Sequence, residues 1–276
     1  MMNRYTTYSR VLNFLEKVVR HQKDKIISIQ IEKMIREVDF HPFLQPIFNA
    51  YGDKLRGCEV LLRVKNNEEF TSPASYIQYL ESSEHMNKIT KRMLRDVSEF
   101  FSTKTNNLPK DFYFSFNIFA SQLNSKDIVQ EIITFCEKFK GKAGLVLEIV
   151  ERGILQLDEE NMGIMETLMN KGVRFAIDDF GAGTSSLKYI EHVGFSTIKI
   201  DRVLTLATDD SLIYQKVIDA IVILSAQLGL SVTAEGVENP VQLKQLRKSG
   251  INSVQGYYLA RPMEMPIFSN IYLQHE

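Results

Sequence analysis

Short apolar runs alternate with amphipathic segments along most of this chain, and this alternation limits the fold more than any other feature. Apolar residues recur with helical spacing between most of the runs, as at Ile89, Met93, Val97 and Phe101. Such alternation predicts an α/β fold, with a mainly parallel sheet covered by helices. About eight strands predict closure into a barrel, which needs roughly 250 residues. The predicted strands are Phe43–Phe48, Cys58–Val64, Phe112–Ile118, Leu145–Val150, Arg174–Ile177, Thr197–Ile200, Ser231–Thr233 and Val254–Tyr258.

Composition narrows the function classes. The 276 residues are 44% hydrophobic and 24% charged, which is ordinary for a soluble globular protein. A net charge of −1 argues against a general nucleic-acid binder. The two cysteines, Cys58 and Cys136, lie far apart and are expected to be reduced thiols. No apolar run reaches the ~18 residues that span a bilayer, so a cytoplasmic protein is expected.

The first 25 residues differ from the rest. Their apolar side chains follow helical spacing, and six Lys or Arg outnumber two acidic residues. We therefore predict a helical extension over residues 1–27, followed by the barrel over 28–276. A basic amphipathic helix can lie on a membrane surface or bind a protein partner, and it can also dock on its own barrel.

Polar side chains gather at the ends of the predicted strands, where α/β barrels carry their chemistry. If the strands share one barrel, these side chains converge at one mouth. Carboxylate and amide oxygens suit Mg²⁺, Mn²⁺ or Ca²⁺, whereas the five histidines show no ligand spacing for zinc. The residues at these ends are Glu59, Arg63, Asn117, Glu148, Glu151, Asp178, Asp179, Lys199, Asp201, Glu235, Glu238 and Gln255.

The charge balance of this mouth favours two metal ions. Five carboxylates (59, 148, 178, 179 and 235) carry −5, and Lys199 with two divalent ions supplies +5. Paired metals serve in-line displacement at phosphorus by activating water and stabilising the leaving oxygen. Arg63 would suit a phosphate oxygen, and Lys199 would deprotonate or position the attacking water.

Eight motifs follow one another along the chain: Gln45-Pro-Ile47, Glu59-Val-Leu61, Asn117, Leu147-Glu-Ile-Val-Glu151, Asp178-Asp-Phe-Gly-Ala-Gly183, Lys199-Ile-Asp201, Ala234-Glu-Gly-Val-Glu238 and Gln255-Gly-Tyr-Tyr258 with Arg261-Pro262. Taken in this order, they resemble the EAL-domain cyclic di-GMP phosphodiesterases. The resemblance covers about residues 28 to 266. It implies a modified TIM (β/α)8 barrel of the EAL type with one antiparallel strand. It also implies hydrolysis of cyclic di-GMP, a bacterial second messenger, to linear pGpG with Mg²⁺ or Mn²⁺, and inhibition by Ca²⁺.

The resemblance assigns roles position by position. The first metal would bind Glu59, Asn117, Glu148 and Asp178. The second would bind Asp178 and Asp179, with Glu235 acting on that side directly or through water. Lys199 would assist the nucleophilic water, Gln255 would orient water or substrate, and Glu151 would tether the loop after Asp179. The substrate contacts would be Gln45, Leu61, Arg63 and Asp201, and a homodimer would form through the loop and helix at residues 181–192.

Five positions depart from the family pattern: Val60, Val64, Phe119, Ala182 and Thr184. None of them removes a predicted metal ligand. They bear on substrate affinity and on control through the loop or dimer. An alternative interpretation is therefore a non-catalytic domain that senses cyclic di-GMP or binds protein. Another metal-dependent phosphodiesterase is a further alternative.

Overall fold

The computed structural model describes residues 22, 25, 26, 29, 33, 40–66, 69–74, 84–150, 157–181, 194–208 and 210–274. Most of the predicted N-terminal extension, residues 1–27, lies outside these ranges and stays a prediction. Chain contacts define two compact units, residues 1–41 with 63–89 and residues 42–62 with 90–276.

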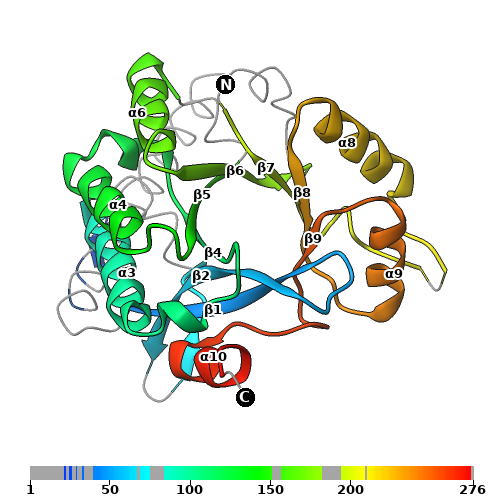
Figure 1. Ribbon diagram of the computed structural model, residues 1–276, viewed down its shortest axis with the longest axis horizontal. Helices are drawn as coiled ribbons and strands as arrows, with labels where there is room; N and C mark the ends of the chain where they lie inside the picture. Colours follow the sequence, from blue (N-terminus) through cyan, green and yellow to red (C-terminus); the bar gives the residue numbers. More distant parts are fainter. Residues whose placement is uncertain are drawn as a thin grey trace, which may run out of the picture. The chain divides into compact units, whose positions relative to one another are not determined.

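The larger unit contains a closed barrel. Its described strands follow the order β1-β9-β8-β7-β6-β5-β4-β2, and pairing between β1 and β2 completes the ring (Figure 1). Along the ring, β2, β4, β5, β6, β7, β8 and β9 pair with their neighbours in parallel, whereas β1 runs antiparallel to β9. The prediction of a TIM-type barrel with one antiparallel strand is thus confirmed. The ring comprises β1 (Phe40–Asn49), β2 (Leu55–Asn66), β4 (Tyr113–Asn117), β5 (Gly144–Val150), β6 (Val173–Phe180), β7 (Thr197–Ile200), β8 (Ser231–Ala234) and β9 (Ser253–Val254).

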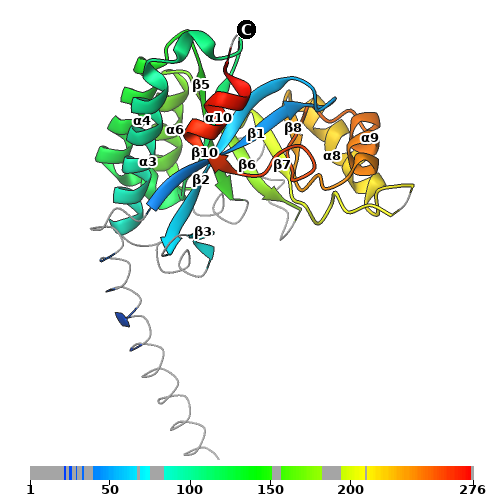
Figure 2. The same cartoon turned by 90° about the horizontal axis from the view of Figure 1, so that it is seen from below.

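Helices cover the outside of the barrel. Helices α4 and α6 lie on one side of the strands, and α8 and α9 lie on the opposite side (Figures 1 and 2). Local sequence sets several of their ends, since Asp158 caps α6 and Asn239 caps α9 ahead of Pro240. The helices are α3 (Glu84–Ser102), α4 (Lys126–Lys138), α6 (Glu159–Met169), α8 (Gln215–Gln227), α9 (Pro240–Lys248) and α10 (Met265–Tyr272). Two 3₁₀ turns, η1 (Thr105–Asn107) and η2 (Ala120–Asn124), flank β4.

The apolar core lies between the strands and the helices. It is rich in phenylalanine, and neighbouring rings such as Phe101 and Phe114 have centroids 5.1 Å apart. These side chains are at most 2% exposed: Phe101, Phe112, Phe114, Phe135, Phe139 and Phe268. Several buried side chains on the strands are instead polar, including Ser115, Glu148, Lys199 and Thr233. The strand pattern therefore buries apolar side chains outside the ring and leaves polar ones for the site.

The smaller unit is described from its strand residues. The last residues of β2 pair antiparallel with β3 (Glu69–Thr71), with Val64 opposite Thr71. The rings of His41 and Phe70 meet edge to face at 5.1 Å.

The last predicted strand is shorter than expected, because β9 ends at Val254 rather than at Tyr258. The backbone of Val237 closes over Gly256 so tightly that a Cβ there would lie 2.2 Å from the Val237 nitrogen. This close approach turns the chain directly after Gln255. The short strands β3 and β10 (Met263–Glu264) and the helices α9 and α10 were not predicted. Within the described residues, no helix is long and apolar enough to cross a membrane.

Candidate active site

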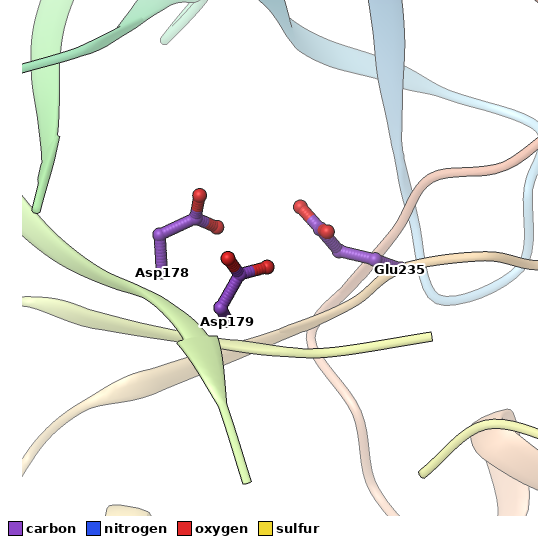
Figure 3. Close-up of side chains that lie close together, drawn as sticks. All are labelled: Asp178, Asp179 and Glu235. Atoms are coloured by element: carbon purple, nitrogen blue, oxygen red, sulfur yellow. The ribbon is translucent and has the colours of Figure 1, made fainter. Parts of the chain in front are cut away.

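Two adjacent carboxylates at the end of β6 point to the same side. Neighbouring residues of a regular strand face opposite ways. Here the β6–β7 register shifts between Ile177 and Phe180, and Asp179 adopts a positive φ of 55°. Aspartate tolerates this left-handed conformation better than most residues. The irregular backbone thus brings Asp178 and Asp179 together, facing Glu235 (Figure 3).

Lys199 is the positive centre of the site. It is only 2% exposed and projects from β7 into a group of carboxylates from other strands. Its Nζ lies 2.5 Å from Glu148 Oε2, 2.7 Å from Glu235 Oε1, 3.0 Å from Asp178 Oδ1 and 3.6 Å from Glu59 Oε2. One ammonium therefore faces four carboxylates.

The carboxylates outnumber the cation, and their pKa values show it. Burial raises the pKa of Glu148 well above its ordinary value and that of Glu235 to about 8; Lys199 lowers both pKa values, and neighbouring carboxylates raise them. Burial and then Asp178 raise the pKa of Asp179 to about 6. Lys199 is also buried, but the surrounding carboxylates hold its pKa well above the ordinary value. In the metal-free protein, Lys199 is therefore a protonated hydrogen-bond donor.

Glu59 is the exception among these acids. Burial raises its pKa, but Lys199 and two side-chain amides outweigh burial, so the pKa is lowered overall. Asn117 Nδ2 donates to Glu59 Oε1 at 2.8 Å, and Gln255 Nε2 donates to Glu59 Oε2 at 2.8 Å. Gln255 Nε2 also lies 3.0 Å from Gln45 Oε1, and Gln45 in turn donates to the carbonyl oxygen of Ala260. These bonds fix Glu59 as a carboxylate.

The residues fit divalent cations. Carboxylate oxygens of Asp178, Asp179 and Glu235 all lie within 4.8 Å of one another. Two buried acceptors, Asp178 Oδ1 and Gln255 Oε1, have no hydrogen-bond partner among the described residues. Asp178 Oδ1 is close to Lys199, but the angle of approach does not form a hydrogen bond. An all-oxygen donor set with excess negative charge suits Mg²⁺ or Mn²⁺.

A cavity of about 310 Å³ opens beside these carboxylates. Four predicted residues line it together with Glu59 and Glu235: Gln45, Leu61, Asp201 and Gln255. Sequence reasoning missed Arg202 and Tyr257, which also line the cavity. The Arg261 guanidinium lies 4.2 Å from the Tyr257 ring centroid, which holds the exposed ring in place. Arg202 directly follows the Lys199–Asp201 motif, and that adjacency is the signal that could have identified it.

Some predicted features stay predictions. Glu151 and residues 182–193, which include Ala182, Thr184 and most of the expected dimer segment, lie outside the described residues. Arg63 belongs to the smaller unit, so its contact with substrate is untested. The departures Val64 and Phe119 are described, with Val64 fully buried and the Phe119 amide donating to Gln122 Oε1.

A family model of the EAL domain matches residues 29–262, which is most of the chain. The chain belongs to the EAL domain family. The fold and the motif order agree with this membership, since the matched region contains the barrel and every predicted site residue.

Curated relatives within this family include two proteins of Escherichia coli K12. The first is the probable cyclic di-GMP phosphodiesterase PdeG, 32% identical over 84% of this chain and 46% of its own length. The second is the cyclic di-GMP phosphodiesterase PdeL, 30% identical over 82% of this chain and 63% of its own length. The chain thus spans about half to two thirds of the length of these relatives.

Solved structures share the fold. The EAL enzyme Bd1971, determined with cAMP and cyclic di-GMP bound, superposes with a TM-score of 0.82 at 25% identity, covering 96% of this chain and 75% of its own. The PaMucR phosphodiesterase in complex with cyclic di-GMP has a TM-score of 0.77 at 26% identity, covering 88% of this chain and 99% of its own.

Proposed function

We propose that this EAL domain hydrolyses one phosphodiester bond of cyclic di-GMP to give linear pGpG. The observation that carries the proposal is the contact of one buried ammonium, Lys199, with four carboxylates beside a cavity lined by Gln45, Leu61 and Asp201. The names of the relatives and of the solved complexes support cyclic di-GMP as the substrate.

Two divalent cations, Mg²⁺ or Mn²⁺, are part of the proposal. Glu59, Asn117, Glu148 and Asp178 would hold one ion. Asp178, Asp179 and Glu235 would hold the other, and the 4.8 Å grouping of their oxygens supports this second set. When bound, the ions supply charge stabilisation and a more acidic water. They would also compensate the carboxylate charge that Lys199 alone does not balance.

The side chains of the chain position the reactants. Lys199 donates hydrogen bonds and favours negative charge near the attacked phosphorus. Gln255 Oε1, which has no partner among the described residues, accepts a hydrogen bond from water. The water oxygen bonds to phosphorus and releases one proton to solvent, the bond from phosphorus to the leaving sugar oxygen breaks, and that oxygen takes up a proton from solvent. Gln45, Leu61, Arg63 and Asp201 would bind the dinucleotide, and Glu151 would hold the loop after Asp179.

The deciding experiment is incubation of the purified chain with cyclic di-GMP and Mg²⁺ or Mn²⁺, followed by chromatography for pGpG. Glu59→Gln keeps the shape of a metal ligand and removes its charge, and Lys199→Met removes the central cation. Each should lower turnover by at least about a hundredfold, in the range of groups that act on the reacting atoms. Lys216→Met, on the exposed face of α8, is the matched control.

The same assay separates catalysis from sensing. Calorimetry with cyclic di-GMP in Ca²⁺ measures binding under conditions expected to block turnover. Binding without pGpG in either activating metal would reject the hydrolase proposal in favour of a sensor domain. Unchanged rates in both site variants would show that the catalytic centre lies elsewhere. The predicted homodimer remains a separate prediction, tested by light scattering.

A further inference from the structure

A second cavity, of about 330 Å³, lies inside the barrel at the end opposite Asp178, Asp179 and Glu235. Four residues that begin barrel strands line it: Tyr113, Thr197, Ser231 and Ser253. We call it the N-terminal cavity. Barrel interiors are usually packed with branched apolar side chains, whereas hydroxyl and amide groups line much of this one. Its volume equals that of about ten water molecules, and its lining is polar. Water can therefore fill it, and it is not a packing defect.

The open end of the N-terminal cavity is positively charged. Arg56 and Arg174 both line it, and neither has an ion-pair partner within the part of the chain that the structure describes. The carboxylate among the lining residues is Glu148, at the inner end. Its two oxygens are already engaged, one by Lys199 Nζ at 2.5 Å and the other by Ser115 Oγ at 2.5 Å. The two arginines therefore lack a compensating charge.

Local sequence holds one of these arginines in place. The Arg174 guanidinium stacks over the Tyr113 ring, 5.0 Å from its centroid. Glycines flank the pair: a Cβ on Gly144 would lie 3.1 Å from Arg174 Nη2, and a Cβ on Gly57 would lie 3.0 Å from the Tyr113 ring. A guanidinium that stacks through its face keeps its N–H edge for a planar or tetrahedral oxyanion. Burial raises the pKa of Tyr113 to about 12, so its hydroxyl remains a donor.

From this cavity and its two uncompensated arginines, we infer that the N-terminal end of the barrel binds a small oxyanion of the phosphate type. On the cavity wall, the Asn252 side-chain oxygen accepts from the Val232 amide and leaves its Nδ2 as a neutral donor, whereas the Ser231 hydroxyl already donates to the Ser196 carbonyl oxygen. An adjoining cavity of about 620 Å³ shares Arg174 and adds Lys110 and Lys142 against one carboxylate, Asp111. It gives room for the organic part of a phosphomonoester. The inference is independent of the proposed hydrolase activity, because the metal-free protein contains the whole site.

Calorimetric titration of the metal-free chain tests this site, with sodium phosphate at constant ionic strength in one arm and glycerol 3-phosphate in the other. Excess negative charge at the catalytic carboxylates disfavours anions there, so the N-terminal cavity dominates the signal. Arg174→Gln and Arg56→Gln should each raise the Kd for the preferred anion by at least about tenfold, as expected for a lost charged hydrogen bond. Lys216→Gln, an equal charge change on exposed α8, should leave the Kd unchanged.

The two arms identify the ligand. Tighter binding of phosphate indicates a free anion, and tighter binding of glycerol 3-phosphate indicates a monoester that uses the adjoining cavity. Absence of binding in both arms would overturn the inference, and so would equal affinity in wild type and both arginine variants. Should Arg174→Gln fail to fold, Arg56→Gln decides alone, because the exposed Arg56 side chain makes no ion pair or ring-stacking contact with the residues that the structure describes.

Discussion

Replacing Lys199 by Met in the metal-free protein should destabilise it by an amount that the site geometry predicts. Lys199 has four carboxylate oxygens within 3.6 Å of its Nζ, and the substitution leaves all four carboxylates without this cation. Removing one partner of a buried ion pair costs about 3–5 kcal/mol. An unfolding entropy of about 2.1 cal/mol/K per residue over 276 residues converts this cost to a Tm decrease of about 5–9 °C.

The loss should depend on pH with a defined sign. A folded-state carboxyl whose pKa is raised binds a proton that the unfolded chain has lost. Stability of the metal-free protein therefore falls as pH rises from the ordinary value of 4.5 to about 8, the pKa of Glu235. Without Lys199, this pKa rises further and the decline continues to higher pH. The Tm difference between wild type and Lys199→Met should thus be small near about pH 5 and largest above about pH 8.

Differential scanning calorimetry in a chelating buffer measures both effects, with Lys216→Met as the control for loss of an exposed charge. A Tm decrease of equal size at acid and alkaline pH would indicate lost packing and refute the charge argument. An unchanged Tm at alkaline pH would show that Lys199 does not neutralise the carboxylates.

Three further predictions concern the metal ligands and the turn after β9. Divalent-ion affinity, measured by calorimetry, should fall as pH drops below about 8, because protons then compete for Glu235, and further below about 6, where they also compete for Asp179; an affinity that is flat through this range would contradict the raised pKa values. Ser115→Ala removes the hydroxyl that donates to Glu148 and should weaken metal binding by about tenfold to a hundredfold, whereas Ser115→Thr should retain most of it. Gly256→Ala should cost about 1–3 kcal/mol or more in chemical denaturation, because its Cβ meets the Val237 backbone at 2.2 Å. Gly163→Ala, in open space on α6, should instead gain about 0.5–1 kcal/mol, and equal effects of the two changes would contradict the packing argument.

Strand pattern and strand-end chemistry predicted the barrel and the group of carboxylates. Parallel strands bring their carboxyl ends to one mouth, so residues far apart in sequence, such as Glu59 and Glu235, could be placed together without coordinates. The order of the motifs likewise predicted that the chain belongs to the EAL domain family. Both signals are local in sequence and need no knowledge of distances.

Other features of the site depend on tertiary geometry. The register shift that turns Asp178 and Asp179 to one side is set by pairing with β7, and no local signal marks it. The four-fold contact of Lys199 depends on side chains from four other segments of the barrel. The shortened β9 depends on how closely Val237 approaches Gly256. The N-terminal cavity was also missed, because strand-end reasoning considered the other end of each strand.

The reversed direction of β1 decides at which end of the barrel this strand begins. In a regular α/β barrel the first strand begins at the end remote from the chemistry. Here the chain passes from Gln45, which contacts Gln255 near the metal ligands, to Asn49, which pairs with Ser253 at the far end. Strand β1 therefore begins at the end of the barrel that holds the carboxylates and finishes at the remote end. Gln255 Nε2 donates to both Gln45 Oε1 on β1 and Glu59 Oε2 on β2, so a single side-chain amide joins the reversed strand to a proposed metal ligand.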